Sequence, residues 1–299
     1  MLVVTGFPYY ELTREIASIL GGVEVGVAEK VFPDGEFYVR ILEPDKIPSN
    51  DVVVVSTTYP KQESSLLKTM LLIDAVKQNN PKRIIAVIPY IAYSRQDKVF
   101  LPGEPVSACM VLKTLKTIGL DVLVVVDIHS PKTLECFGGP AYNVLVSDLL
   151  VKAALKYLEN PIVLAPDQGA LERASYAART LGLNYDFLVK SRDRVTGAIT
   201  YKPKELSVKG RDVVLVDDII STGGTIAEAS RILLQQGARR VVVAATHGLL
   251  VGDALKKLKE AGVEKLILAN TLLVKHEHEL IEYVNITEAL KPVLEKITS

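Results

Sequence analysis

The sequence predicts a doubly wound α/β protein built from two similar domains in tandem. Short apolar runs rich in Val, Ile and Leu recur along the 299 residues, as expected for parallel strands buried on both faces. Between most of these runs lie segments with the spacing of amphipathic helices. This alternation predicts mainly parallel sheets with helices on both faces.

Six apolar runs are expected to form strands: 51–56, 83–89, 121–127, 161–167, 211–218 and 240–247. Three segments between them are expected to form helices: 64–78, 106–119 and 225–237. The last of these ends at Gly237, a residue typical of helix C-termini. The tail from Asn285 has the pattern of a capped helix, which we expect to pack back on the first domain.

An internal repeat predicts the domain boundaries. The strand before Ser94–Asp97, the following helix and the strand before His129 resemble, in order, the strand before Asp217–Thr225, its helix and the strand ending at His247. Two copies of one domain explain this better than one large sheet. We expect an N-terminal domain at 1–146, a C-terminal domain at 147–284 and a terminal helix at 285–299.

Composition limits the possible partners. Lys plus Arg and Asp plus Glu each number 35, so no net charge is available to attract a nucleic acid. No apolar run is long enough for a membrane span, and the start lacks the pattern of a signal peptide. The two cysteines, Cys109 and Cys136, are expected to be separate, incidental thiols, which fits a reducing cytoplasm.

The segment Val213–Thr225 carries the strongest chemical signal. An apolar strand leads into two acids, Asp217 and Asp218, and then into a Ser-Thr-Gly-Gly-Thr loop before a helix. Glycines let backbone N–H groups approach a phosphate, hydroxyls add donors and the helix N-terminus adds positive potential. A simple capped turn would explain the glycines and hydroxyls but not the paired acids.

This segment resembles the phosphoribosyl-binding loop of type I phosphoribosyltransferases. The resemblance implies a ribose 5-phosphate site, with the diol held by the acids and the phosphate held by the loop. The residues that it assigns are Asp217, Asp218, Ser221, Thr222, Gly223, Gly224 and Thr225.

Four further motifs resemble signatures of ribose-phosphate diphosphokinases, in that family's order. They begin at Val31, Pro89, Val125 and Ala165. The resemblance covers nearly the whole chain and is greatest to the short archaeal type. It implies transfer of a diphosphoryl group from ATP to ribose 5-phosphate, which gives AMP and phosphoribosyl diphosphate.

Two segments would bind ATP by this resemblance. The Asp-Gly pair at Asp34 and Gly35 alone predicts only a hairpin turn. In the family, this hairpin completes the active site of a neighbouring subunit, which implies a homo-oligomer with Phe32 stacked on adenine and Asp34 and Glu36 as hydrogen-bond acceptors. The second segment is Arg95, Gln96 and Asp97, where the guanidinium would contact phosphate. Without the resemblance, it would read as a helix cap or surface loop.

The remaining assignments concern the metal and the transferred group. The resemblance implies Mg²⁺ held by His129 and Asp167, and the carboxylate and phosphate oxygens should dominate that binding. Asp167 and Gly169 belong to a loop resembling the family's diphosphate loop, from which Gln168 and Ala170 depart. Lys190 and Arg192 would close over the transferred group, with Arg192 also near ribose 5-phosphate.

Two other functions fit parts of the sequence. A phosphoribosyltransferase that consumes the diphosphate would explain Val213–Thr225, but not the duplicated domain or the hairpin at Phe32. A non-catalytic regulatory homologue would not need Lys190 and Arg192. The loop Lys98–Pro105 has no arginine. We therefore do not expect phosphate to activate the protein at this loop.

Overall fold

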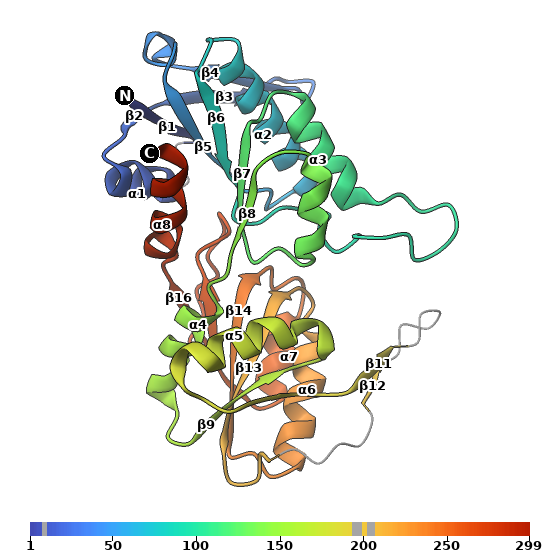
Figure 1. The fold of residues 1–299 in the computed structure, drawn as a ribbon. Coiled ribbons are helices and arrows are strands. Elements are labelled where there is room, and N and C mark those ends of the chain that lie inside the picture. The colour runs from blue at the N-terminus through green and yellow to red at the C-terminus, as the bar shows by residue number, and fades with distance from the viewer. Residues whose placement is uncertain (8–10, 193–198, 202–206) are drawn as a thin grey trace. The chain divides into compact units, whose positions relative to one another are not determined.

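The computed structural model describes residues 1–7, 11–192, 199–201 and 207–299. The chain forms two compact units, which are described separately. Unit 1 comprises Met1–Val144, Thr271–Val274 and Ile286–Ser299, and unit 2 comprises Leu145–Asn270 and Lys275–Asn285 (Figure 1).

Unit 1 contains a six-stranded sheet in the order β2-β1-β5-β6-β7-β8, with every neighbouring pair parallel. Its elements in chain order are β1 (Leu2–Gly6), α1 (Glu11–Leu20), β2 (Val23–Val25), β3 (Val27–Val31), β4 (Phe37–Ile41), η1 (Pro44–Lys46), β5 (Asp51–Val55), α2 (Gln62–Lys77), β6 (Arg83–Val87), α3 (Ser107–Thr117), β7 (Val122–Val126), η2 (Pro131–Phe137), β8 (Ala141–Val144) and α8 (Thr287–Thr298). Strands β3 and β4 form a separate antiparallel hairpin.

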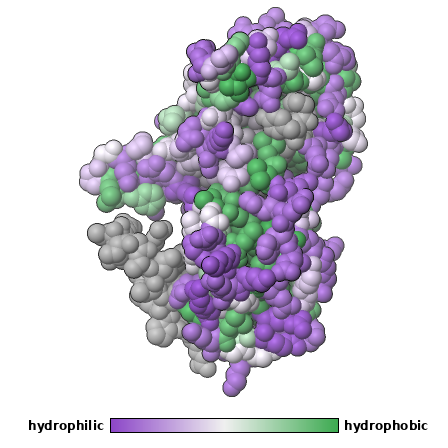
Figure 2. Space-filling model, turned by 180° about the vertical axis from the view of Figure 1, so that it is seen from behind, coloured by the Kyte–Doolittle hydropathy of each residue, from purple (hydrophilic) through white to green (hydrophobic). Residues whose placement is uncertain are grey.

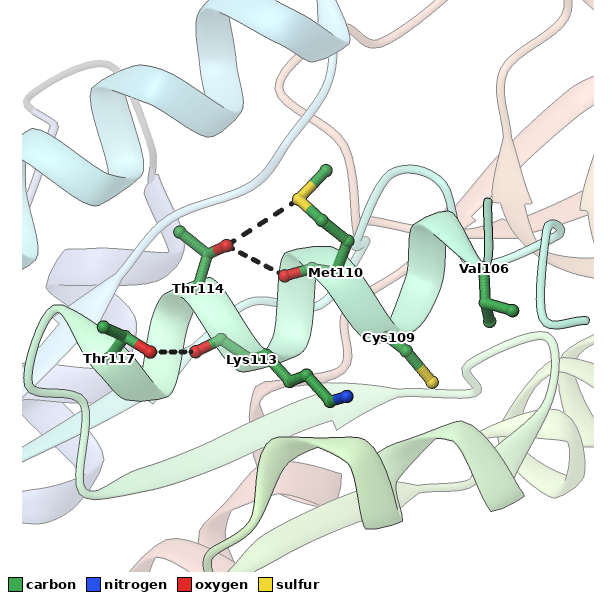
Figure 3. Close-up of a pocket in the computed structure, with 6 residues that line it drawn as sticks. All are labelled: Val106, Cys109, Met110, Lys113, Thr114 and Thr117. Atoms are coloured by element: carbon green, nitrogen blue, oxygen red, sulfur yellow. Dashed lines mark hydrogen bonds between the residues drawn. The ribbon is translucent and has the colours of Figure 1, made fainter. Parts of the chain in front are cut away.

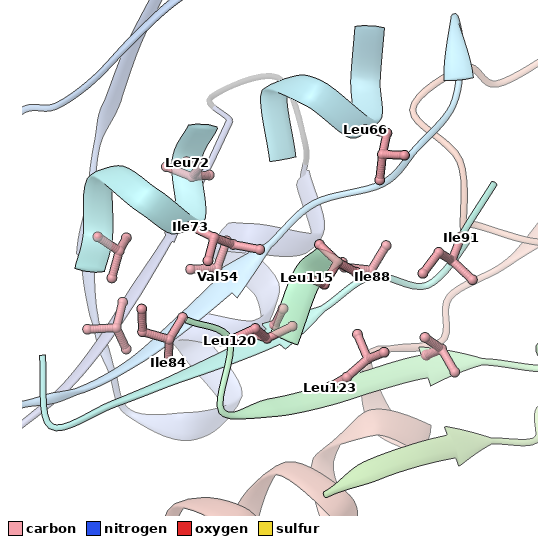
Figure 4. Packing of buried hydrophobic residues seen from close by; sticks show 14 of the residues in the cluster. Val54, Leu66, Leu72, Ile73, Ile84, Ile88, Ile91, Leu115, Leu120 and Leu123 are labelled. Atoms are coloured by element: carbon pink, nitrogen blue, oxygen red, sulfur yellow. The ribbon is translucent and has the colours of Figure 1, made fainter. Parts of the chain in front are cut away.

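Helices cover both faces of this sheet, as the sequence predicts (Figure 1). On one face, side chains of α2 and α3 pack on alternate residues of the central strands, including Val54, Ile84 and Leu123 (Figure 4). On the other face, α1 packs beside α8, where the Thr287 hydroxyl donates to the Glu15 carboxylate at 2.6 Å. The C-terminal helix therefore belongs to unit 1.

Unit 2 repeats this arrangement with the sheet order β10-β9-β13-β14-β15-β16, again parallel throughout. Its elements in chain order are α4 (Ser147–Ala154), η3 (Leu155–Tyr157), β9 (Pro161–Ala165), η4 (Gln168–Ala170), α5 (Leu171–Leu181), β10 (Tyr185–Phe187), β11 (Lys190–Arg192), β12 (Ile199–Tyr201), β13 (Asp212–Ile220), α6 (Gly224–Gln235), β14 (Arg240–Gly248), α7 (Ala254–Glu260), β15 (Val263–Ala269) and β16 (Ile281–Val284). Helices α6 and α7 contribute to one buried cluster, and α4 and α5 pack on the sheet together.

The two units confirm the predicted tandem duplication, but the predicted alignment of the halves is wrong. Sheet order makes β5 equivalent to β13, and β6 equivalent to β14. The segment Ser94–Asp97 follows β6, so it does not occupy the place of Asp217–Thr225, and His129 does not correspond to His247. Apolar strands and amphipathic helices alternate throughout, so a shift by one strand and one helix still aligns like with like.

Equivalent ion pairs close the amino ends of the two sheets. In unit 1, Arg83 donates from Nε and Nη2 to the two oxygens of Asp51 at 3.0 and 2.6 Å. In unit 2, Arg239 holds the fully buried Asp212 in the same two-pronged way, at 2.7 and 2.6 Å. Both aspartates begin the third strand of their sheet. Hydrogen bonding to Arg239 lowers the pKa of Asp212 to about 2.

The expectation of separate thiols is wrong, because Cys109 and Cys136 form a disulfide. Cys109 lies on α3 and Cys136 on η2, and these two elements pack together beside the sheet. Their separation of 27 residues gave no indication of this contact, since it depends on η2 folding back after β7. Without free thiols, cysteine usage does not indicate a reducing compartment.

No candidate membrane-spanning helix is present in the part of the chain that the structure describes. Among these residues, no helix has both the length and the apolar character needed to cross a membrane. Hydrophilic side chains cover much of the face drawn in Figure 2, with apolar side chains gathered in smaller areas.

Asp212→Asn is expected to lower the free energy of unfolding by about 2 kcal/mol near neutral pH, given the depressed pKa. The folded pKa lies below the ordinary value of about 3.9, so this stabilisation is present above pH 4 and disappears as the pH falls towards 2. Urea denaturation between pH 7 and pH 2 measures it. Substitution of the exposed Asp253 by Asn is the control, and a difference that persists at pH 2 would contradict the assignment.

Cys109→Ser is expected to lower the free energy of unfolding by about 3 kcal/mol without reductant, because the disulfide closes a loop between residues 27 apart in sequence. With reductant present, wild type and variant should unfold alike. Alkylation of denatured wild type, followed by mass spectrometry, provides a direct check. Uptake of two alkyl groups in the absence of reductant would show that the thiols are free.

Candidate functional site

The strand order of unit 2 reverses between β9 and β13, and this reversal creates the candidate site. The chain leaves these neighbouring strands towards opposite faces of the sheet, which opens a crevice at their carboxyl ends. Asp167 follows β9, and the loop Ser221–Gly223 follows β13. The fold therefore brings two segments predicted to bind the sugar phosphate and the diphosphate to the same edge of one sheet.

The loop after β13 has the geometry of an anion site. Gly223 caps α6 with φ of +76°, and an added Cβ would lie 3.3 Å from Leu258 Cγ and 3.4 Å from the Ala254 carbonyl oxygen. Positive φ and this crowding both require glycine. The helix start presents backbone N–H groups to the crevice, an arrangement that stabilises a phosphate. Strand β13 extends to Ile220, two residues beyond the expected strand, so both predicted acids lie within it.

The two acids are adjacent near the end of β13 and interact directly. The Asp217 carboxylate accepts a hydrogen bond from the Asp218 backbone N–H at 2.9 Å. The pKa of Asp217 is raised well above its usual range, chiefly because surrounding protein atoms desolvate its carboxyl. The neighbouring carboxylates of Asp218 and Asp167 raise it further. A ligand that donates hydrogen bonds, such as a sugar diol, or a cation would favour the ionised form of these carboxyls.

Asp167 is held in place by its own loop. Its carboxylate caps η4 by accepting from the backbone N–H groups of Gly169 at 2.9 Å and Ala170 at 3.3 Å. An added Cβ on Gly169 would lie 3.1 Å from the same carboxylate oxygen, so glycine keeps this cap uncrowded. Gln168 and Ala170, which depart from the family pattern, leave this capping arrangement intact.

At the equivalent reversal of unit 1, the side chains after β5 are bonded within the unit. The segment after β5 contains Ser56, Thr57 and Thr58, all buried. Ser56 Oγ lies 2.7 Å from Thr69 Oγ1, Thr57 donates to the Thr271 carbonyl at 3.2 Å, and Thr58 donates to the Tyr90 carbonyl at 2.9 Å. Hydroxyls that would face a phosphate in unit 2 are used here for internal contacts.

Thr58 also supports the predicted nucleotide segment of unit 1. Its Oγ1 accepts from the Ala92 N–H at 2.6 Å, which fixes the turn leading to Arg95 and Gln96. Gln96 is held by the Ser107 hydroxyl, which donates to its side-chain oxygen at 2.6 Å. A cavity of about 270 Å³ opens here, lined by Gln62, Glu63, Tyr90, Ala92, Tyr93, Ser94, Arg95 and Gln96. Asp97 follows directly and is half-buried.

The predicted hairpin is present, with Phe32–Glu36 at its tip. Phe32 N–H donates to the Glu36 carbonyl at 2.8 Å, Gly35 takes φ of +96°, and Glu36 N–H donates to the Asp34 carboxylate at 3.2 Å. The Phe32 ring is exposed and stands edge-on to Tyr38, with centroids 6.1 Å apart. An aromatic ring and two carboxylates are thereby presented to solvent.

The predicted metal and catalytic residues are only partly described. His129 follows β7 in unit 1, whereas Asp167 lies in unit 2, so their pairing stays a prediction. In the part of the chain that the structure describes, no three His, Cys, Asp or Glu side chains cluster as a metal site. Lys190 and Arg192 lie on β11, which pairs with β12, and their side chains fall outside the described part.

Sequence reasoning missed two buried side chains that organise these segments. Thr58 stands outside every motif singled out, and Arg173 lies within the motif that begins at Ala165 but was given no role there. Arg173 is 6% exposed, and its Nη2 lies 3.6 Å from Asp218 Oδ2. Its place in that motif, four residues beyond the glycine of a predicted loop, was the available signal.

A second hollow lies along the outer side of α3. It measures about 440 Å³ and is lined by Val106, Cys109, Met110, Lys113, Thr114 and Thr117. Figure 3 shows that Thr114 turns its hydroxyl back to the carbonyl and sulfur of Met110, while Thr117 bonds the Lys113 carbonyl. The hydroxyls of Thr114 and Thr117 therefore donate within α3. None of the predicted site residues line this hollow.

Comparison with known proteins agrees with this geometry. The sequence matches the N-terminal domain of ribose phosphate pyrophosphokinase over residues 1–119 and the phosphoribosyl transferase domain over residues 143–267. The fold and the site thus define a protein with two phosphoribosyltransferase-type domains.

Whole-chain relatives specify the family further. The chain is 47% identical over 245 residues to the ribose-phosphate pyrophosphokinase of Pyrococcus furiosus, covering 81% of this chain and 85% of that protein. It is 39% identical to the Saccharolobus solfataricus protein of the same name, over 92% of this chain and 94% of that one. The crystal structure of phosphoribosylpyrophosphate synthetase from Mycobacterium smegmatis superposes with a TM-score of 0.88 at 31% identity, over 99% and 98% of the two chains. The chain belongs to the ribose-phosphate pyrophosphokinase family.

Thr58→Val is expected to lower the free energy of unfolding by about 1–3 kcal/mol, because it leaves the buried Ala92 N–H and Tyr90 carbonyl without their side-chain partner. Urea denaturation measures the change. Thr117→Val removes an exposed hydroxyl from α3 and should cost much less. Equal losses for the two variants would contradict the role given to Thr58.

Proposed function

We propose that this protein transfers a diphosphoryl group from ATP to the anomeric hydroxyl of ribose 5-phosphate, giving phosphoribosyl diphosphate and AMP. The observation that carries this proposal is the Ser221–Thr225 loop beside Asp167 at the strand-order reversal of unit 2. The chain also matches both domains of the ribose-phosphate pyrophosphokinase family. Ribose-phosphate diphosphokinase is the enzyme name for this reaction.

Ribose 5-phosphate binds at the loop after β13 in this proposal. Its phosphate accepts from the hydroxyls of Ser221, Thr222 and Thr225 and from backbone N–H groups at Gly223 and Gly224, at the positive end of α6. The carboxylates of Asp217 and Asp218 accept from the two ring hydroxyls.

ATP binds through unit 1. The exposed Phe32 ring stacks on adenine, with Asp34 and Glu36 accepting from the base, and Gly35 permits the turn that brings them together. Arg95 and Gln96 line the cavity after β6, Asp97 follows them directly, and all three contact the phosphates. The hairpin tip completes the nucleotide site of a second subunit, so the active form is a homo-oligomer.

Catalysis depends on alignment and charge stabilisation. The ribose hydroxyl attacks the β-phosphorus of ATP while AMP leaves, without a covalent intermediate on the protein. Lys190 and Arg192 neutralise charge on the transferred group. The oxygen donors of Asp167, together with His129, suit Mg²⁺ held mainly by substrate phosphates, and this ion would supply further neutralisation of phosphate charge.

One assay tests the reaction. The protein is incubated with ATP, Mg²⁺ and ribose 5-phosphate, and AMP and phosphoribosyl diphosphate are quantified. We expect the two products in equal amounts, and no AMP when ribose 5-phosphate is omitted. Formation of ADP in place of AMP would reject diphosphoryl transfer. Consumption of added phosphoribosyl diphosphate with a free base would instead indicate a phosphoribosyltransferase.

Asp217→Ala is expected to raise the KM for ribose 5-phosphate by roughly 10- to 100-fold, since hydrogen bonds to a charged acceptor contribute about 1.5–3 kcal/mol. The KM for ATP should change little. Initial rates with each substrate varied in turn give both constants. Asp253→Asn serves as a control for surface charge, and a change confined to the KM for ATP would overturn the assignment.

A further inference from the structure

Arg173 occupies an unusual position for an arginine. It lies near the start of α5 and is 6% exposed, although charged side chains are rarely buried without a partner. The Ser147 hydroxyl donates to its backbone carbonyl at 3.0 Å, which fixes this turn of α5 against the start of α4. The backbone that carries Arg173 is therefore held against α4.

The guanidinium lies between the two loops of the proposed sugar-phosphate site. Nη2 lies 3.6 Å from Asp218 Oδ2, and Nη1 lies 3.5 Å from the Gly169 carbonyl oxygen. Asp218 belongs to β13, and Gly169 belongs to the loop after β9. A single planar group thus contacts both sides of the strand-order reversal.

Charge compensation explains why an arginine is needed here. Asp218 is 4% exposed and lies beside Asp217, on which the Asp167 carboxylate also acts. A buried carboxylate in such company is costly unless a cation is close. The rigid fork of arginine can serve a carboxylate and a carbonyl at once, whereas the ammonium of lysine is a single point charge.

We propose that Arg173 is a positioning residue that holds the ribose-binding carboxylate Asp218 and the diphosphate loop at Gly169 at a fixed separation. This role rests on the proposed function, because the anomeric hydroxyl must meet the transferred group between these two loops. Arg173 is buried behind them and acts through them. It does not touch the substrates.

The test uses three variants of the full chain. Arg173→Met removes the charge and keeps most of the length, Arg173→Lys keeps the charge, and Arg179→Met is the matched control. Arg179 lies two turns further along α5, is exposed and donates to the Tyr185 hydroxyl at 3.0 Å. Circular dichroism establishes that each variant is folded before kinetics are measured.

Arg173→Met should raise the KM for ribose 5-phosphate by roughly 10- to 100-fold, the usual effect of losing a group that orients a ligand contact. The KM for ATP should stay within about twofold, and Arg173→Lys should recover part of the affinity for ribose 5-phosphate because it restores the charge. Equal effects on both KM values, or no recovery in the lysine variant, would overturn the proposal.

Unfolding provides a readout independent of activity. A double-mutant cycle of Arg173→Met and Asp218→Asn should show coupling, with the double variant more stable than the sum of the single losses predicts. If Arg173→Met does not fold, Arg173→Lys replaces it in the cycle. Additive losses would reject the Arg173–Asp218 pairing. Wild type that makes no AMP and phosphoribosyl diphosphate would reject the proposed function, while the cycle would still test the pairing.

Discussion

The rest of the structure depends on one constraint, the reversal of strand order in each sheet. The reversal lies between the strands that come first and third along the chain, β1 and β5 in unit 1 and β9 and β13 in unit 2. Parallel strands place all their carboxyl ends at one edge, and the reversal sends the loops of β9 and β13 to opposite faces there. Side chains separated by about fifty residues in sequence, such as Asp167 and Asp217, then act on one another electrostatically. Unit 2 needs no special scaffold for its site beyond this topology.

Duplication gave both units the same strand-order reversal, but the loops at the two reversals differ in what they present. In unit 2, glycines and a helix start face the crevice, whereas in unit 1 the hydroxyls of Ser56, Thr57 and Thr58 are bonded to their own domain. In unit 1, the Thr58 hydroxyl instead fixes the turn before Arg95 by accepting from the Ala92 N–H. The hairpins β3–β4 and β11–β12 follow the second strand of their sheets, so the proposed adenine-binding hairpin and the hairpin of Lys190 and Arg192 are equivalent insertions.

The sequence was sufficient for much of the fold, because buried parallel strands and amphipathic helices leave a periodic signal. All six expected strands and all three expected internal helices are present, as is the Asp-Gly turn. Short strands such as β2 and β16 carry too few residues for a pattern. The alignment of the halves was wrong because that pattern repeats with every strand and helix. The disulfide and the pairing of Arg173 with Asp218 could not be predicted, since each depends on contacts made only when separate elements pack.

The two ends of the sheets show how charge is divided between stability and binding. At the amino ends, Asp51 and Asp212 are each matched by a two-pronged arginine, and hydrogen bonding lowers the pKa of both carboxyls. At the carboxyl end of unit 2, Asp217 sits beside two other acids, and its pKa is raised. Like charges crowded in this way repel one another, and the proposed sugar diol would donate hydrogen bonds to them. The Arg173 guanidinium, 3.6 Å from Asp218, supplies positive charge beside the group.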